Sequence, residues 1–170
     1  MKDSLRIGYH SQEKRGIQLI GPVICKRLNA WLGNGYYFWD DKIDAINWGN
    51  NAKTKTKKFE IYKADIDTEN FLNTVFDEDH YKFWLRIIES VAKKFHKQNN
   101  KKPEISHINL YLEENGYWKE NNIQGIIFQD ISENPNQTMV KSLYYKKRIQ
   151  IVVFNLDKIS NFALDSIHNI

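Results

Sequence analysis

The chain has 170 residues and a formal net charge of +4, and 41% of its residues are hydrophobic and 14% aromatic. This composition excludes a disordered chain and predicts a single domain over residues 1–170 with a substantial core. The one cysteine, Cys25, excludes an internal disulfide and a cysteine zinc cluster, and no metal site is expected. No apolar run reaches the ~20 residues of a membrane span, and MKDSLRIGYH lacks the apolar region of a signal peptide. We therefore expect a cytoplasmic protein without a membrane partner.

The first half of the chain predicts strands, one helix and a long irregular connection. Residues 4–11 (SLRIGYHS) have strand character, and the glycine-punctuated residues 11–31 predict irregular structure. Asp40 or Asp41 is placed to cap a helix over DKIDAINWGN, which should end at Gly49. In residues 57–67 apolar and polar positions alternate, which predicts a strand with Phe59 and Ile61 on one face and Glu60 and Tyr62 on the other.

The second half predicts two helices followed by strands. After Asp77, an apolar stripe at helical spacing predicts a long helix; its members are Trp84, Leu85, Ile88, Val91, Ala92 and Phe95. A second helix is expected from Pro103 to Gly116. Residues 123–131 and 148–156 predict strands separated by the polar turn SENPNQT, and the tail 162–170 predicts a short helix or a frayed end. The order of elements favours an α+β fold with a mostly antiparallel sheet.

Three short stretches contain candidate functional residues. GYHS places His10 at a strand end, GNGYYF places Tyr37 after a glycine turn, and RIQIVVFN places Gln150 at the start of a strand. By residue chemistry alone each has an ordinary structural interpretation: a hydrogen-bonded histidine, a core tyrosine and an edge-strand polar contact.

Taken in order, these stretches resemble the diphtheria-toxin and poly(ADP-ribose) polymerase branch of the ADP-ribosyltransferases. That family has a His, Tyr, Glu signature on split antiparallel β-sheets with flanking helices. Tyr9-His10-Ser11 is similar to its histidine stretch, and Gly33–Phe38, followed by a helix that contains Ala45, is similar to its tyrosine stretch. The segment Gln150-Ile151-Val152-Val153-Phe154 is similar to the strand that the glutamate opens, with Gln in place of Glu.

The resemblance implies NAD⁺ as a substrate and a role for each matched residue. His10 would bind the hydroxyls of the nicotinamide ribose, and the backbone at Ser11 would hold the carboxamide. Tyr37 would stack on the cationic nicotinamide ring, with Gly35 allowing the backbone to bend beneath it, whereas Tyr36 should point into the core. Arg15, with Lys14 beside it, could pair with the pyrophosphate or could remain a solvated loop charge.

Two residues depart from the family pattern. Ser11 replaces the usual glycine after the histidine. Gln150 replaces a carboxylate that can act as a base, whereas an amide can only hydrogen-bond. Elongation into poly(ADP-ribose) is therefore not expected. Transfer of a single unit is compatible with an acceptor that is already nucleophilic, with an acceptor that brings its own base, or with another acid in place of the glutamate, for which Asp130, Glu113 and Glu114 are candidates.

The leading hypothesis is a mono-ADP-ribosyltransferase that modifies a protein or nucleic-acid acceptor, as a bacterial toxin, effector or phage-defence enzyme with a possible inhibitor protein. The first alternative is a catalytically silent module of the same fold that binds NAD, ADP-ribose or nucleic acid. A small basic nuclease or RNA-binding domain is a further alternative. Its support is the clustering of basic residues at 53–58, 93–102 and 144–148, which is also typical of solvated strand and helix ends.

Overall fold

The computed structural model describes residues 4–26, 30–53, 55–130 and 146–170. Its strands form one hydrogen-bonded sheet in the order β4-β5-β6-β2-β1-β3-β7. The strands are β1 (Leu5–Glu13), β2 (Tyr36–Trp39), β3 (Lys58–Asp67), β4 (Phe71–Asn73), β5 (Gly125–Asp130), β6 (Arg148–Val153) and β7 (Ile159–Asn169). The four helices are α1 (Lys42–Ala52), α2 (Glu78–Asn99), α3 (Ile105–Glu114) and α4 (Tyr117–Glu120), and a 3₁₀ turn spans Leu156–Lys158.

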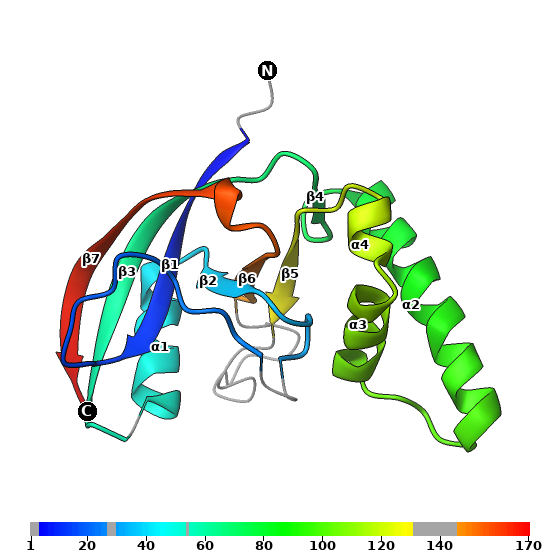
Figure 1. The fold of residues 1–170 in the computed structure, drawn as a ribbon, viewed down its shortest axis with the longest axis horizontal. Coiled ribbons are helices and arrows are strands. Elements are labelled where there is room, and N and C mark those ends of the chain that lie inside the picture. The colour runs from blue at the N-terminus through cyan, green and yellow to red at the C-terminus, as the bar shows by residue number, and fades with distance from the viewer. Residues whose placement is uncertain (1–3, 27–29, 54, 131–145) are drawn as a thin grey trace, which may run out of the picture.

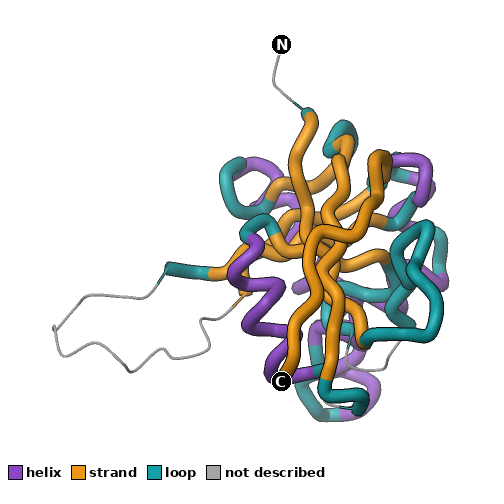
Figure 2. The backbone as a smooth tube through the Cα atoms, turned by 90° about the vertical axis from the view of Figure 1, so that its left-hand side faces the viewer, coloured by secondary structure: helices purple, strands orange, loops and turns teal. Residues whose placement is uncertain are grey.

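The sheet is antiparallel except for the pair β4 and β5, which confirms the predicted α+β class with a mostly antiparallel sheet. Within the described residues the seven strands are hydrogen-bonded in one order, and their pairing does not show the expected division into two sheets. The junction between β1 and β2 is narrow, with Tyr9 opposite Trp39 as its registered pair. On one side of this junction β1, β3 and β7 run alongside one another as long strands (Figure 2).

Helices α2, α3 and α4 lie together at the β4–β5 end of the sheet, and α1 lies near β1 and β3 (Figure 1). The helix α2 begins after Asp77, as its sequence predicts, because the Asp77 carboxylate accepts hydrogen bonds from the backbone N–H groups of Asp79 and His80. Within its predicted apolar stripe Trp84, Ile88 and Val91 are buried, whereas Leu85 is exposed.

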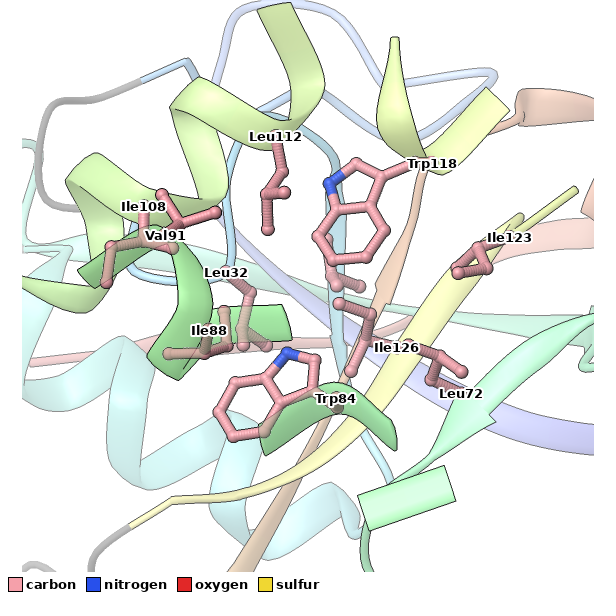
Figure 3. Close-up of a cluster of buried hydrophobic side chains, with 11 residues drawn as sticks. Leu32, Leu72, Trp84, Ile88, Val91, Ile108, Leu112, Trp118, Ile123 and Ile126 are labelled. Atoms are coloured by element: carbon pink, nitrogen blue, oxygen red, sulfur yellow. The ribbon is translucent and has the colours of Figure 1, made fainter. Parts of the chain in front are cut away.

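The largest hydrophobic cluster joins these three helices to one face of the sheet (Figure 3). We call it the helical core; its fully or nearly buried members are Leu32, Leu72, Trp84, Ile88, Val91, Ile108, Leu112, Trp118, Ile123, Ile126 and Val152. On the opposite face, Ile127 and Ile151 pack in a second cluster with Phe38. The predicted strands β5 and β6 therefore alternate between two buried faces, as strands in the middle of a covered sheet do.

Two sequence predictions were wrong. Helix α1 continues through Gly49 to Ala52, and Gly49 packs against the ring of Phe59 within the helix. The tail is neither a helix nor frayed but the edge strand β7, which pairs along β3. In β3 the predicted alternation is confirmed: Phe59 and Ile61 share one cluster, and Glu60 and Tyr62 lie on the other face. Glu60 and Tyr62 are also buried, because the irregular segment after β1 covers them.

Contacts with this segment explain how β3 holds a buried carboxylate. The Tyr62 hydroxyl donates to Glu60 Oε2 (2.7 Å) and accepts from the backbone N–H of Leu19 (3.1 Å), while Lys14 Nζ lies 3.0 Å from Glu60 Oε1. Burial raises the pKa of Glu60, but the hydrogen bonds from Tyr62 and Lys14 outweigh burial, and the net pKa is lowered. The contacts of Lys14 with Glu60 and of Leu19 with Tyr62 anchor the segment that carries Arg15 onto the sheet.

The predicted turn SENPNQT lies outside the described residues. In the part of the chain that the structure describes, no helix has the length and apolar character needed to span a bilayer.

Candidate functional site

A cavity of about 430 Å³ opens where β1 meets β2, beside the N-terminal end of β6. His10, Tyr37 and Gln150, which are far apart in the sequence, all line it. Its volume is within the range of roughly 300–1,000 Å³ that is usual for small-molecule sites. The structure therefore brings the three predicted residues to one hollow.

The register of β2 and β6 explains how two of these residues meet. Tyr37 is opposite Val152 and Trp39 is opposite Gln150. Opposed residues of antiparallel strands share a face, and so do residues two positions apart on one strand. Tyr37, Trp39 and Gln150 consequently project from the face that the helical core covers further along, at Val152.

His10 enters from β1 and is held by a hydrogen bond between its Nδ1 and the carbonyl oxygen of Tyr37 (2.8 Å). A carbonyl only accepts, so Nδ1 carries the proton and Nε2 is the acceptor. Burial lowers the pKa of His10 to about 4; the bond to Tyr37 opposes this effect and the cation of Lys53 adds to it. The imidazole is therefore neutral at pH 7.

Two residues that line the cavity each have a buried polar atom without a hydrogen-bond partner among the described residues. They are His10, at Nε2, and Ser11, at Oγ. Buried polar atoms in proteins are nearly always paired, and the exceptions often mark a place where water or a ligand binds. The neutral imidazole acceptor of His10 suits a ligand with hydroxyl groups, such as a ribose.

The hydroxyl of Tyr37 is used inside the protein. It donates to the carbonyl of Gly33 (2.7 Å) and accepts from the backbone N–H of Leu32 (3.1 Å). Burial, with a further contribution from Cys25, raises the pKa of Tyr37 well above its ordinary value. Tyr37 therefore stays protonated, and what it can offer to a ligand is its ring. Tyr36, on the other face of β2, packs against the second cluster, as its sequence position predicts.

The carboxamide of Gln150 is oriented by Trp31. The indole Nε1 of Trp31, which can only donate, lies 3.1 Å from Gln150 Oε1. Because Trp31 occupies the amide oxygen of this buried side chain, Gln150 can offer a ligand the N–H groups of its amide. It can donate a hydrogen bond at the cavity but cannot take up a proton.

Of the other predicted binding residues, Ser11 and Arg15 line the cavity, and Gly35 does not. A Cβ at Gly35 would lie 2.5 Å from Val152 Cγ2 and 3.0 Å from the carbonyl oxygen of Val153. The expectation that Gly35 serves the ligand is therefore corrected: the glycine allows β2 to approach β6 closely. The left-handed backbone of the turn lies at Gly33, with φ of 91°.

Sequence analysis missed several residues of the cavity. Trp31, Trp39, Lys53 and Arg148 all line it. Trp48 lines it as well, and 38% of its surface is exposed. A signal was present for Lys53 and Arg148, since they belong to the basic clusters 53–58 and 144–148. The positions of the indole groups depend on how α1 and the segment before β2 fold against the sheet.

The three candidate acids lie in different places, and one of them is at the cavity. Asp130 lines the cavity, and its Oδ2 is 2.7 Å from Arg148 Nη2. Glu113 instead accepts hydrogen bonds from the backbone and side-chain nitrogens of Asn34 (3.1 and 3.2 Å), which fixes the turn before β2. Glu114 belongs to the end of α3 and is not among the residues of the cavity.

Among the described residues, no group of histidine, cysteine, aspartate or glutamate side chains is arranged to hold a metal ion. The comparisons with known proteins found no matching family model, no similar curated protein and no similar solved structure. What the site can do is therefore inferred from the residues of the cavity itself.

Proposed function

We propose that this protein is an ADP-ribosyltransferase that cleaves NAD⁺ at its nicotinamide–ribose bond and transfers one ADP-ribose unit to an acceptor. The observation that carries the proposal is the convergence of His10, Tyr37 and Gln150 around one cavity, in the chain order of the family signature. The finer fold assignment, an ADP-ribosyltransferase-like arrangement, belongs to the same proposal, and the narrow β1–β2 junction at the cavity supports it.

Each part of NAD⁺ has a chemically suitable partner in the cavity. The ring of Tyr37 provides a flat surface for the cationic nicotinamide. His10 Nε2 accepts a hydrogen bond from a ribose hydroxyl, and the Gln150 amide donates one. Arg15 and Lys53 supply positive charge for the pyrophosphate. Cleavage develops positive charge on the ribose, so holding its hydroxyls in place is the main contribution of these groups.

Gln150 restricts the outcome of the reaction. Elongation needs a base that activates a hydroxyl of the previous unit, and a carboxamide cannot act as one. We therefore propose the transfer of single units, to a protein or nucleic-acid acceptor. As part of this proposal, the setting is a bacterial toxin, effector or phage-defence system, in which an inhibitor protein would accompany the enzyme.

The direct test is incubation of the purified protein with NAD⁺ labelled in its adenylate part, in the presence of cell lysate. Released nicotinamide and label attached to macromolecules are measured together. Separate treatment with protease and with RNase or DNase then identifies the class of acceptor. If neither free nicotinamide nor labelled product forms, the proposed activity is wrong.

The Tyr37 ring should dominate NAD⁺ affinity. We expect Tyr37→Ala to weaken binding about 5- to 30-fold in calorimetry, because a stacking contact with a cationic ring contributes about 1–2 kcal/mol. Tyr37→Phe is the matched control: it keeps the ring and should keep the affinity, although it lowers the stability by about 1–3 kcal/mol by removing the partners of Leu32 N–H and Gly33 C=O. Equal affinities of the alanine and phenylalanine variants would exclude Tyr37 as the stacking platform.

The second candidate function is a catalytically silent module that binds NAD⁺ or ADP-ribose. The observation that favours it is the neutral Gln150, whose oxygen is already held by Trp31. Gln150→Glu distinguishes the two functions. The carboxylate would still accept from the indole, and we expect at least a tenfold gain in NAD⁺ hydrolysis because a base then adjoins the ribose. A silent module would bind NAD⁺ equally well before and after the substitution and release no nicotinamide in either form.

A further inference from the structure

The cavity needs a group that can accept the proton of an incoming acceptor, and its side chains limit the choice. Gln150 is an amide, and Tyr37 keeps its proton because burial raises its pKa. His10 donates through Nδ1 to the carbonyl oxygen of Tyr37, and the proposed function assigns its Nε2 to a ribose hydroxyl. Arg15, Lys53 and Arg148 contribute cations. Among the described residues of the cavity wall, Asp130 is the one carboxylate.

Asp130 is also close to the position where the family carboxylate would act. In the β5–β6 register Phe128 is opposite Gln150, and Asp130 is opposite Arg148. Asp130 and Gln150 therefore project from the same face of the sheet on adjacent strands, as diagonal neighbours. Diagonal pairs of this kind have Cα atoms about 7–8 Å apart, within the reach of one bound ribose and an acceptor hydroxyl.

Arg148 holds this carboxylate in place. Its Nη2 is 2.7 Å from Asp130 Oδ2, and its guanidinium lies over the ring of Trp39, 4.9 Å from the centroid. Both side chains are largely buried, with exposed fractions of 12% for Arg148 and 20% for Asp130. A charge-assisted bond of this length gives the carboxylate one orientation at the cavity.

We propose that Asp130 is the catalytic base of this enzyme, taking the role for which Gln150 has no proton-accepting group. The inference rests on the proposed function. The bond between ribose C1′ and the nicotinamide nitrogen breaks, and its electron pair leaves with nicotinamide, which becomes neutral. An oxygen or nitrogen of the acceptor forms the new bond to C1′, and its proton passes to the Asp130 carboxylate.

An acceptor hydroxyl becomes strongly acidic as it bonds to the cationic ribose. The proton therefore passes to the carboxylate late in the reaction, after the bond to the ribose has begun to form. In this scheme Gln150 orients the ribose and Arg148 positions Asp130. The family glutamate would both orient the ribose and accept the proton, whereas here these two functions are divided between β6 and β5.

The experiment compares Asp130→Asn with wild type for NAD⁺ affinity by calorimetry, and for nicotinamide release and lysate labelling at saturating NAD⁺. We expect an affinity within about threefold and a rate that falls roughly 10²–10⁴-fold. Glu89→Gln, an exposed acid on α2 away from the cavity, is the matched control and should keep the wild-type rate. An Asp130→Asn rate within threefold of wild type overturns the inference.

Chemical rescue separates a base from a structural partner of Arg148. Added formate should restore at least a tenth of the lost rate to Asp130→Ala and leave the wild-type rate unchanged. If formate has no effect while NAD⁺ affinity falls more than tenfold, Asp130 is a structural partner and the inference is wrong. Where the asparagine and alanine variants do not fold, Asp130→Glu replaces them: it keeps the pair with Arg148, displaces the carboxylate by one methylene, and should lower the rate at least tenfold.

Failure of the inference can be told from failure of the proposed function. A wild-type protein that binds no NAD⁺ and releases no nicotinamide contradicts the proposed function and, with it, the inference. A wild-type protein that is active, with an Asp130→Asn variant that is equally active, contradicts the role of Asp130 alone.

Discussion

Gly49→Ala should lower the free energy of unfolding by about 2–3 kcal/mol, although alanine is the better helix former. A Cβ at this position would lie 2.6 Å from Phe59 Cζ and closer still to two other ring carbons. Phe59 is fully buried beneath α1 and stacks on His168 at 5.1 Å, so it has little room to move. The clash therefore outweighs the gain in helix propensity of about 1 kcal/mol. Urea unfolding at pH 7 measures the difference.

Gly16→Ala is the matched control for this prediction. A Cβ at Gly16 would meet no atom within 4 Å, and the stability should stay within about 0.5 kcal/mol of wild type. In the double variant with Phe59→Leu, the smaller side chain relieves the clash, and the two changes should be coupled by at least about 1 kcal/mol. Additive losses in the double variant would show that Gly49 and Phe59 are not in contact.

Stability should also fall steeply in mild acid because of His10. Its pKa is about 4 in the folded protein and 6.5 for an exposed histidine. Between these values the unfolded chain binds a proton that the folded protein does not, so stability is lost as the pH falls from 6.5 to 4. The full effect of this one group is about 3 kcal/mol. Urea unfolding at intervals between pH 7 and pH 4 measures the loss.

His10→Gln should remove this part of the pH dependence, since the amide does not titrate. Asp41 and Asp67 also have lowered pKa values, chiefly through hydrogen bonds with Lys146 and Lys158. Burial raises the pKa of Asp165, but hydrogen bonds with Lys42 and Ser166 outweigh burial, and its net pKa is lowered. Protonation of these carboxylates lowers stability in both proteins. The difference between wild type and variant therefore isolates His10. His107→Gln, at an exposed position of α3, should keep the wild-type profile. Parallel profiles for wild type and His10→Gln would contradict the prediction.

The elements that sequence analysis predicted well are those whose signal is local. The apolar stripe of α2 and its Asp77 cap depend on residues within a few positions of each other. The apolar runs of β5 and β6 are likewise contiguous. The order of His10, Tyr37 and Gln150 along the chain was also sufficient to predict that they would share a site, although their chemical roles remain proposals.

The wrong or missing predictions concern residues whose environment comes from distant segments. The tail is a strand because β3 offers it a hydrogen-bonding edge, and Glu60 is buried because residues 14–19 fold over β3. Neither fact is encoded near the residues concerned. Trp48 was not predicted at the site for the same reason: only the packing of α1 places it at the cavity.

By itself the amino-acid sequence determined the α+β class, the long helix, the main strands and the three residues that resemble the ADP-ribosyltransferase signature. These features depend on periodicity and on short motifs, which involve residues close together in the sequence. Only the tertiary structure decided that Gly35 serves strand packing, that Trp31 holds the oxygen of Gln150, and that Asp130 meets Arg148 at the cavity. Such pairs are decided by strand register and by the burial of charge, which arise when segments distant in the sequence come together.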